Sequence, residues 1–396
     1  MSATVNKLSF TILLLCCGYF IDFYDLTIMG VSYHELIQQQ FLINDPLKIQ
    51  QVYLLITNFQ TLGIFAGALI FGTLGDKIGR VKTISLSILC YSIATLLSVV
   101  THSLALFIFL RVIAYAGLAC EFATSSTLII ELYHTKLANL ANALLYSFGI
   151  LGGLLATSIG FFSWRVMFIC GGVGGLILFA FRQQLEESKV FKNTPQQSPR
   201  GEPRAQISKI FRLLLLNIPY YMLVSLMFIL PNFMQLPYDI AKSTKILLCG
   251  FFIGNIISCL LGVLINNRLR SYKPVLYMSF IGYLLTLTLF SWVKSNYFFS
   301  YSLSLGLIGG AYPVAWIQIV AKSYPMRLRA TATNTLFALG RMSGIVINLM
   351  LGYWLNTPSN FIQNTLTLVI LIFSLALFAL YKTPNNYAAE VTSTSA

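Results

Sequence analysis

Charged residues are scarce in this sequence. Only 10% of its 396 residues are Asp, Glu, Lys or Arg, whereas 57% are hydrophobic and the mean hydropathy is +0.77. A chain with so few charges and so many apolar side chains does not fit an ordinary soluble domain. The composition is typical of a protein that crosses a membrane many times, so we expect a polytopic membrane protein.

Among the charged residues, acidic ones are fewer than basic ones. The chain has 12 Asp and Glu against 26 Lys and Arg, a formal net charge of +14. An excess of positive charge can indicate nucleic-acid binding, but that function needs basic residues clustered on one face. The basic residues here lie mostly in the short segments between apolar stretches. We therefore expect no nucleic-acid partner and expect the lipid bilayer instead.

Cysteine patterns and nucleotide-binding motifs are missing as well. The seven Cys residues lie in apolar stretches, without the paired loop spacing of disulfides or the spacing of metal ligands. No phosphate-binding loop of the type G-x-x-x-x-G-K-S/T occurs, which argues against ATP as the energy source. We expect no metal site, no cofactor, no catalytic residue and no enzymatic activity.

Twelve apolar stretches are long enough to span a bilayer. They lie at about 8–31, 52–73, 83–101, 104–132, 138–161, 164–182, 212–233, 244–266, 274–293, 299–322, 331–355 and 360–381. A polar segment rich in Pro, Gln and Ser follows the sixth stretch and is typical of a flexible linker. We predict an all-α membrane protein with twelve transmembrane helices in two six-helix bundles. The predicted parts are an N-terminal bundle (1–182), a cytoplasmic linker (183–211), a C-terminal bundle (212–382) and a short cytoplasmic tail (383–396).

The distribution of Lys and Arg predicts the orientation. If the N-terminus is cytoplasmic, the inner loops contain most of the basic residues, among them Arg182 at the inner end of the sixth stretch. The positive-inside rule then places both termini in the cytoplasm of a multi-pass protein in the cell inner membrane. In internally repeated carriers of this kind, the solute site is expected near mid-membrane, where the two halves meet.

Two acids interrupt the first apolar stretch. Asp22 and Asp25 are three residues apart, so they share one side of a helix. A charged side chain at the centre of a membrane costs at least ~2.5–3.5 kcal/mol on insertion scales, so these acids need a partner or a proton. We therefore treat both as candidate proton-coupling residues.

Depth along the helices suggests partners for these acids. At ~1.5 Å per residue, Asp22 lies about 21 Å from the cytoplasmic end of its span and Arg111 about 10 Å from the outer end of the fourth span. In a ~30 Å hydrocarbon core the two are level, which favours an ion pair if the spans pack together. Glu121 falls deeper on the same span, and we treat Arg111 and Glu121 as candidate proton-coupling residues together with the two acids. Glu131 falls at the cytoplasmic exit, where we expect it to pair with basic loop residues as a gate strut.

Structural explanations remain open for several of these residues. The pair of Asp22 and Arg111 could serve only to hold helices together, Asp25 could face a hydroxyl or a helix dipole, and Glu121 could be a packing acid. Arg341, in the eleventh span, has no obvious acidic partner in the second half, which favours contact with the solute. Four aromatic residues are candidate solute contacts, although aromatic residues in membrane proteins more often pack or anchor at the interface. These are Tyr24, Tyr115, Tyr221 and Trp316.

The loop after the second span is the most specific fold signal. It reads G-T-L-G-D-K-I-G-R from Gly72 to Arg80, with Asp76, Lys77 and Gly79 between them. Glycines permit a tight turn, and the acid and arginine can form charge-assisted hydrogen bonds that hold the cytoplasmic ends together. The loop resembles the signature motif of the major facilitator superfamily, which implies a cytoplasmic gate here. In the second half the corresponding acid is replaced by Asn266, which weakens any charged latch there.

Three further segments are similar to the metabolite:proton symporter family of that superfamily, which includes proline/betaine, alpha-ketoglutarate, citrate and shikimate carriers. The first span matches its pattern of glycine, acid, aromatic pair, aspartate and glycine. The fourth span matches in its arginine, glycine and two glutamates, and the segment Tyr324 to Arg329 resembles an aromatic-proline-to-arginine motif before span eleven. The resemblance implies a role for Arg329 at the gate.

These observations predict a secondary carrier. We expect a symporter that imports a small organic solute together with protons by alternating access and functions as a monomer. Protonation of a buried acid would release its arginine, because burial favours the neutral carboxyl and the arginine favours the charged one. Two buried arginines favour a carboxylate or a zwitterion such as an amino acid or betaine over a sugar. The alternative is a proton-driven drug or metabolite efflux antiporter, although the fifth span lacks the proline expected of one.

Overall fold

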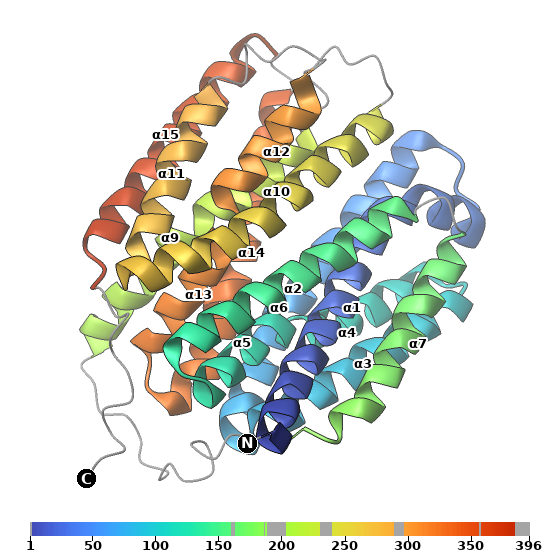
Figure 1. The fold of residues 1–396 in the computed structure, drawn as a ribbon. Helices are drawn as coiled ribbons and strands as arrows, with labels where there is room; N and C mark the ends of the chain where they lie inside the picture. The colour runs from blue at the N-terminus through green and yellow to red at the C-terminus, as the bar shows by residue number, and fades with distance from the viewer. Residues whose placement is uncertain are drawn as a thin grey trace. The chain divides into compact units, whose positions relative to one another are not determined.

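The computed structural model describes residues 2–159, 163–185, 187, 203–229, 240–288, 297–355 and 358–384. Within these ranges the regular structure is helical (Figure 1). The first half contains α1 (Ser2–Phe41), α2 (Pro46–Ile78), α3 (Arg80–Val100), α4 (Leu104–Leu118), α5 (Glu121–Leu132), α6 (Thr135–Ser158) and α7 (Trp164–Arg182). The second half contains α9 (Pro203–Ile229), α10 (Ile240–Leu269), α11 (Lys273–Thr288), α12 (Phe298–Gly309), α13 (Tyr312–Ser323), α14 (Met326–Leu355) and α15 (Pro358–Tyr381).

Eleven helical segments of the described chain are long and apolar enough to cross a membrane. The ninth predicted span corresponds to α11, whose 16 described residues end at Thr288, and the remaining predicted residues 289–293 lie outside the described ranges. The predicted fold, an all-α membrane protein of twelve spans, is confirmed. Half of the described helices are longer than the apolar stretches predicted for them, and α9 already begins at Pro203, inside the segment predicted as linker. Proline suits a helix start because the first N–H has no partner there.

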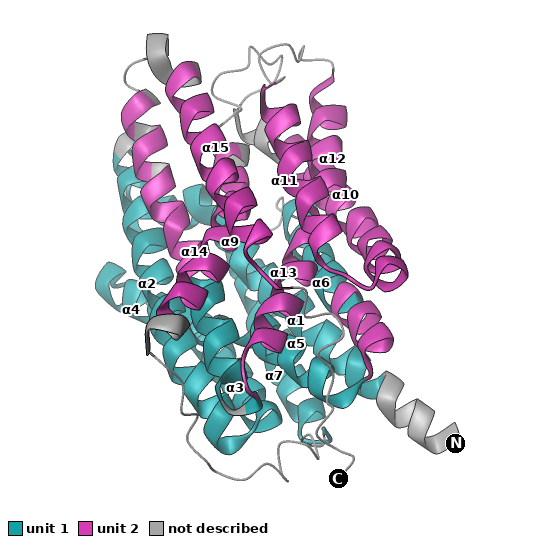
Figure 2. Cartoon of the chain, turned by 90° about the vertical axis from the view of Figure 1, so that its left-hand side faces the viewer, with its two compact units in different colours: residues 1–133, 144–194, 326–338 teal, residues 134–143, 195–325, 339–396 magenta. Residues whose placement is uncertain are grey.

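The chain divides into two compact units, shown in different colours in Figure 2. Unit 1 comprises residues 1–133, 144–194 and 326–338, and unit 2 comprises residues 134–143, 195–325 and 339–396. The beginning of α6 is thus grouped with unit 2, and the beginning of α14 with unit 1. Each unit therefore contains one short segment from the opposite half of the sequence.

The same helix pairs recur in both units. In unit 1, α2 packs along α4, α3 along α7 and α1 along α7. In unit 2, the corresponding helices pack in the same way, with α10 along α12, α11 along α15 and α9 along α15. The two halves are therefore repeats of one helical arrangement.

Glycines allow the closest of these helix contacts. A Cβ atom at Gly67 of α2 would lie 2.1 Å from the carbonyl oxygen of Ala116 on α4, and one at Gly254 of α10 would lie 2.3 Å from that of Leu303 on α12. Small residues let helix backbones approach within a membrane, where packing rather than the hydrophobic effect holds helices together. Both contacts join the second helix of a half to its fourth helix.

The fourth span of each half is divided into two helices. Residues 119–120 separate α4 from α5, and residues 310–311 separate α12 from α13. Pro313 lies in the first turn of α13, where its missing N–H is tolerated. In the first half the division makes Glu121 the first residue of α5. The sequence predicted one uninterrupted span in each case.

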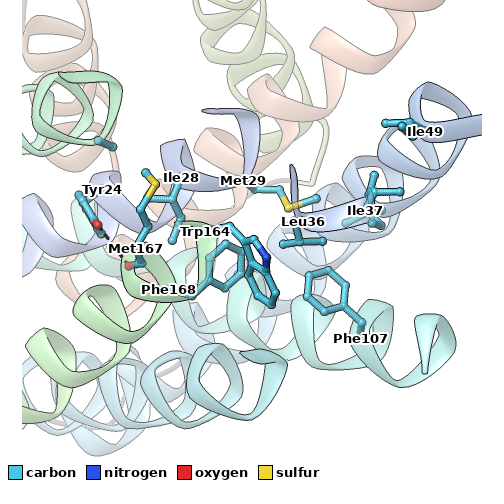
Figure 3. Close-up of a cluster of buried hydrophobic side chains, with 12 residues drawn as sticks. Tyr24, Ile28, Met29, Leu36, Ile37, Ile49, Phe107, Trp164, Met167 and Phe168 are labelled. Atoms are coloured by element: carbon cyan, nitrogen blue, oxygen red, sulfur yellow. Dashed lines mark hydrogen bonds between the residues drawn. The ribbon is translucent and has the colours of Figure 1, made fainter. Parts of the chain in front are cut away.

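A buried apolar cluster lies beside the first-span acids. In Figure 3, Trp164, Met167 and Phe168 of α7 face Phe107 of α4 and the apolar side of α1. The indole N–H of Trp164 donates a 3.1 Å hydrogen bond to Gln39 Oε1 near the end of α1. This cluster fixes α1 against α4 and α7, the helices that surround its acids.

Candidate functional site

The acids of the first span are buried on α1. Asp22 and Asp25 have 1% and 0% of their surface exposed, and Arg111 of α4 is fully buried. Arg111 Nη1 lies 3.8 Å from Asp25 Oδ2. The hydroxyl of Thr95 on α3 lies between them, because it donates to Asp25 Oδ2 at 3.1 Å and accepts from Arg111 Nη1 at 3.4 Å. One polar contact thus links α1, α3 and α4 inside unit 1.

Two aromatic rings hold the guanidinium of Arg111. Its Cζ lies 5.0 Å from the ring centroid of Tyr115 and 5.0 Å from that of Phe168. Cation–π contacts of this kind are strongest away from water. The hydroxyl of Tyr115 donates to the carbonyl of Leu26 at 3.2 Å, which ties this ring to α1 beside Asp25.

Arg111 pairs with Asp25 in the structure. Helix depth matched Arg111 with Asp22, about one turn earlier on α1, and that pairing stays a prediction. The predicted hydroxyl neighbour of Asp25 is present as Thr95. Depth estimated from apolar stretches is uncertain by several residues, so it could not separate two acids one turn apart. The proton-coupling roles of both acids stay predictions.

A second buried ion pair joins α5 to α7. Arg182 Nη1 donates to Glu121 Oε2 at 2.9 Å, and Nη2 donates to Glu121 Oε1. Ser125 also donates to Glu121 Oε1, at 3.3 Å, and Arg182 Nη1 reaches the carbonyl of Ile84 at 3.4 Å. Both charged side chains are fully buried. Their two parallel hydrogen bonds are the geometry in which arginine holds carboxylates most strongly.

This second pair was not predicted. Arg182 was assigned to the inner loop because it ends an apolar stretch, yet the structure buries it completely. The available signal was Glu121, a buried acid for which the sequence offered no partner. Helix α1 passes directly over the pair at Gly18, where a Cβ atom would lie 1.7 Å from Arg182 Nη2. Only glycine fits that position without moving the arginine.

The signature loop forms a third charged cluster. Arg80 is fully buried, and its Nη2 lies 3.0 Å from Glu131 Oε1 on α5. The same Nη2 donates to the carbonyl of Met326 at the start of α14, at 2.6 Å. Arg329 Nη1 lies 3.9 Å from the same Glu131 oxygen. The predicted pairing of Glu131 with basic residues is therefore present.

Asp76 binds the first turns of α14. Its carboxylate accepts hydrogen bonds from the backbone N–H of Ala330 at 3.2 Å and Thr331 at 2.8 Å, and from the Thr331 hydroxyl at 2.6 Å. It also lies 3.2 Å from Arg80 Nη2. Hydrogen bonds from N–H and O–H donors stabilise the charged form of a carboxylate. Asp76 and Arg80 together bind both N–H and C=O groups of this turn.

The glycines of the loop shape this cluster. Gly79 has φ +107°, a conformation that side-chain-bearing residues rarely adopt, and it turns the chain from α2 into α3. A Cβ atom at Gly72 would lie 3.1 Å from Thr331 Cα, so Gly72 lets α2 approach α14. Glu187 accepts from the backbone N–H of Val81 at 3.0 Å and caps the start of α3. Lys77, in contrast, is exposed.

The corresponding cluster in unit 2 contains amides, a phenol and a lysine. Asn139 Nδ2 donates to Asn267 Oδ1 at 2.7 Å, and the Tyr272 hydroxyl donates to Asn139 Oδ1 at 2.9 Å. Lys322, the next-to-last residue of α13 as Glu131 is of α5, lies over the Tyr272 ring at 5.4 Å and donates to Thr135 Oγ1 at 3.4 Å. The repeat thus keeps the position of the latch but replaces its acids with amides and a phenol.

Arg341 lies in unit 2 beside Tyr221. The two side chains form a hydrogen bond, and Arg341 is half-buried. A Cβ atom at neighbouring Gly340 would lie 2.1 Å from Asn217 Nδ2, so α14 packs closely on α9 there. The hydroxyl of Tyr312 donates to Asn217 Oδ1 at 3.4 Å. A guanidinium, a phenol and an amide therefore lie near one another on α9, α13 and α14.

The other predicted aromatic contacts are buried and bonded to backbone. Trp316 is fully buried, and its indole N–H donates to the carbonyl of Leu213 at 3.0 Å. The hydroxyl of Tyr24 donates to the carbonyl of Met167 at 3.2 Å. Their roles in solute binding stay predictions. Within the described ranges, no three His, Cys, Asp or Glu side chains gather as metal ligands would.

A helical protein of twelve spans, with two repeated halves and ion pairs buried inside a unit, has the architecture of a secondary membrane carrier. The family model described as Major Facilitator Superfamily matches residues 15–334. The chain belongs to this superfamily. The expected resemblance to its metabolite:proton symporters is confirmed with it.

Two curated bacterial relatives are similar over most of their length. The chain is 25% identical to the 3-(3-hydroxy-phenyl)propionate transporter of Escherichia coli, with 74% of each protein covered. It is 23% identical to the benzoate transport protein of Acinetobacter baylyi, with 88% of this chain and 84% of that protein covered. Among solved structures, the proton:xylose symporter XylE has a TM-score of 0.80 at 13% identity, covering 96% of this chain and 97% of that one. This last likeness concerns the fold alone.

Proposed function

We propose that this protein is a proton-coupled symporter that imports a small organic carboxylate, or the carboxylate end of a zwitterion, by alternating access. The observation that supports the proposal most is the contact between Asp25 and Arg111, fully buried within membrane-spanning helices. A buried acid and arginine in a membrane are expensive to maintain and commonly mark ion or proton pathways. We place the protein in the cell inner membrane as a monomer with both termini in the cytoplasm.

The proposed cycle depends on which form of Asp25 is present. In its charged form Asp25 holds Arg111 and, through Thr95, the adjacent part of α3. Protonation removes the negative charge, so the attraction to Arg111 is lost and α1 and α4 are no longer held by the same force. A difference in interaction energy between two conformations is what a ligand needs to shift their populations. Here the proton is that ligand. We propose that Asp22, one turn away on α1, takes part in the same proton transfer.

The solute class is proposed from Arg341 and from the relatives. A guanidinium can hold a carboxylate by two parallel hydrogen bonds, and Tyr221 beside it offers a hydroxyl and a ring face. The two relatives named above are described as transporters of hydroxyphenylpropionate and of benzoate, both aromatic carboxylates. We therefore rank aromatic carboxylates first among the carboxylates to be tested. Arg111, Tyr24, Tyr115 and Trp316 are proposed as further solute contacts.

The signature-loop cluster is proposed as the cytoplasmic gate. Its supports are the hydrogen bonds of Asp76 and Arg80 to the start of α14, together with the ion pairs of Glu131. These bonds must break whenever α14 moves away from α2. The gate therefore adds an energy barrier to opening that the binding of solute and proton has to overcome.

The test is uptake into proteoliposomes made with the purified protein. The labelled solutes are aromatic and aliphatic carboxylates, amino acids, betaines and sugars, each with and without an inward proton gradient. The proposal expects at least one carboxylate or zwitterion to accumulate only when the gradient is present. Accumulation of a sugar alone would overturn the solute class. A solute driven outward by proton entry would instead establish the efflux antiporter.

A further inference from the structure

The two oxygens of the Asp25 carboxylate have different surroundings. Oδ2 accepts the hydrogen bond from Thr95 and lies next to Arg111. Oδ1 is buried and has no hydrogen-bond partner among the residues that the structure describes. Gly171 of α7 lies beside it, since a Cβ atom there would lie 3.4 Å from Oδ1 and 3.4 Å from Tyr24 Cε1. A buried oxygen without a donor is the place where an added proton disturbs the fewest existing bonds.

The direction of the Thr95 hydrogen bonds favours the charged form of Asp25. A hydroxyl has one proton, and here it points to Asp25 Oδ2 while the hydroxyl oxygen accepts from Arg111 Nη1. The hydrogen bond from Arg111 to the Thr95 oxygen therefore polarises the hydroxyl and strengthens its hydrogen bond to the carboxylate. Hydrogen bonds to a charged group are stronger than those to a neutral one, so protonation of Asp25 weakens this arrangement.

Arg111 cannot readily replace the hydrogen bond to Asp25 Oδ2 when the Thr95 hydroxyl is removed. Its guanidinium is held between Tyr115 and Phe168, with both centroids 5.0 Å away, and its Nη1 is 3.8 Å from Asp25 Oδ2. Moving it into direct hydrogen-bond distance of the carboxylate would break these ring contacts. Removal of the Thr95 hydroxyl should therefore leave the charged carboxylate less stabilised.

Other charged or titratable groups surround Asp25. On its own helix they are Asp22 and Tyr24, on α3 Tyr91, on α4 Arg111 and Tyr115, and on α7 Cys170, which lies beside Tyr24. On α5, Glu121 is engaged by Arg182 of α7. Thr95 and Gly171 are the neutral neighbours that contact the two carboxylate oxygens themselves.

We propose that Asp25 binds the transported proton on Oδ1, over Gly171, and that the Thr95 hydroxyl on Oδ2 sets the pH at which this happens. The inference rests on the proposed proton-coupled function, but it concerns the titration of one carboxyl group and can be measured without transport. Thr95 is a positioning residue in this account, since it acts through Asp25. Gly171 is needed because it leaves Oδ1 free of a side chain.

The experiment is a pH titration of the purified, solute-free protein followed by infrared difference spectroscopy of the carboxylic acid C=O stretch. Asp25→Asn identifies the band of Asp25 by its loss. Thr95→Val should move the midpoint of that band to higher pH by about one unit, the shift expected from losing one hydrogen bond to a charged group. Thr95→Ser keeps the hydroxyl and should titrate like the wild type.

Substitutions at Gly171 test whether the proton binds to Asp25 Oδ1. Gly171→Ala places an apolar methyl group against the charged oxygen and should raise the midpoint, whereas Gly171→Ser offers a hydroxyl donor to Oδ1 and should lower it. The matched control is Gly174→Ala on the same helix, whose Cβ would lie 3.4 Å from Ile21 Cδ1 of α1 and nearest to no polar group. The control should leave the midpoint unchanged.

Opposite shifts for Ala and Ser at Gly171, together with a raised midpoint for Thr95→Val, support the proposal. It is overturned if Thr95→Val leaves the midpoint in place, if both Gly171 variants behave like Gly174→Ala, or if the band persists in Asp25→Asn. These results are separate from the transport assay. Failure of proton-driven uptake would reject the proposed function while leaving the titration result standing.

Discussion

Glu121 and Arg182, 61 residues apart in the sequence, bind each other through two hydrogen bonds in the fully buried interior of unit 1. Their pair stands beside that of Asp25 and Arg111, so α1 is next to two buried charge pairs and not one. The two pairs differ in geometry. Glu121 and Arg182 are joined by two direct hydrogen bonds. Asp25 Oδ2 and Arg111 Nη1, in contrast, are 3.8 Å apart and are bridged by the hydroxyl of Thr95. We therefore propose that the tighter pair holds helices together and that the looser pair responds to a proton.

Gly18→Ala should destabilise the protein. The added methyl would lie 1.7 Å from Arg182 Nη2 and 2.5 Å from Glu121 Oε1, so it forces the ion pair or α1 to move. Overpacking of a filled site costs ~1–3 kcal/mol. The matched control is Gly30→Ala on the same helix, whose Cβ would meet only the Tyr53 hydroxyl at 3.7 Å. Thermal unfolding in detergent measures both, and equal melting temperatures for the two variants would contradict this packing.

Arg182→Ala should be more damaging than the double variant Glu121→Gln with Arg182→Gln. Removing one partner of a buried ion pair leaves an uncompensated charge and typically costs ~3–5 kcal/mol, whereas two amides of similar size leave none. Folded yield and thermal unfolding in detergent are the measurements. If the single variant is as stable as the wild type, Glu121 has a charge partner other than Arg182.

Arg80→Lys should loosen the proposed gate although the charge is kept. Lysine cannot reproduce the contacts of one guanidinium with Glu131, Gly75 and Met326. We expect the start of α14 to become more accessible to a thiol reagent at an introduced Ala332→Cys, a partly buried position, and uptake to fall severalfold. Lys82→Ala removes an exposed charge from the neighbouring turn and serves as the control. Unchanged labelling in Arg80→Lys would exclude this role.

Arg341→Lys should raise the KM for a carboxylate solute while the protein remains folded and inserted. The substitution keeps the positive charge but loses the two-pronged hydrogen bonding that a guanidinium offers a carboxylate. Concentration-dependent uptake measures the change, and we expect at least a tenfold rise. Tyr353→Phe, at a residue that is 72% exposed on the same helix, should transport normally. Normal transport by Arg341→Lys would remove this residue from the solute site.

Much of the fold could be predicted because its signals are local. Apolar stretches of spanning length revealed the helices, and the glycine-rich loop from Gly72 to Arg80 indicated the superfamily. The pairing of Glu131 with a basic loop residue was also predicted, since an acid at the inner end of one span and a basic inner loop were both visible, and the structure shows Arg80 as this partner. Such patterns depend on residues that are close in sequence or on membrane depth.

The remaining contacts depend on rotations and bends that composition does not report. Asp22 and Asp25 differ by one helical turn, and only tertiary packing brings Asp25 Oδ2 to 3.8 Å from Arg111 Nη1. Arg182 looked like a loop residue because it ends an apolar stretch, yet α7 places it opposite Glu121. The division between α4 and α5 has no proline to announce it, unlike that before α13. These features arise from tertiary packing.

The measurement that tests the central claim most directly compares two transport modes of Asp25→Asn in proteoliposomes. Asparagine resembles the protonated, neutral carboxyl but cannot release a proton. The account predicts that the variant loses accumulation driven by an inward proton gradient, while counterflow exchange of the same solute, which needs no net proton movement, continues at a substantial rate. Accumulation by Asp25→Asn to the wild-type level under the same gradient would contradict it.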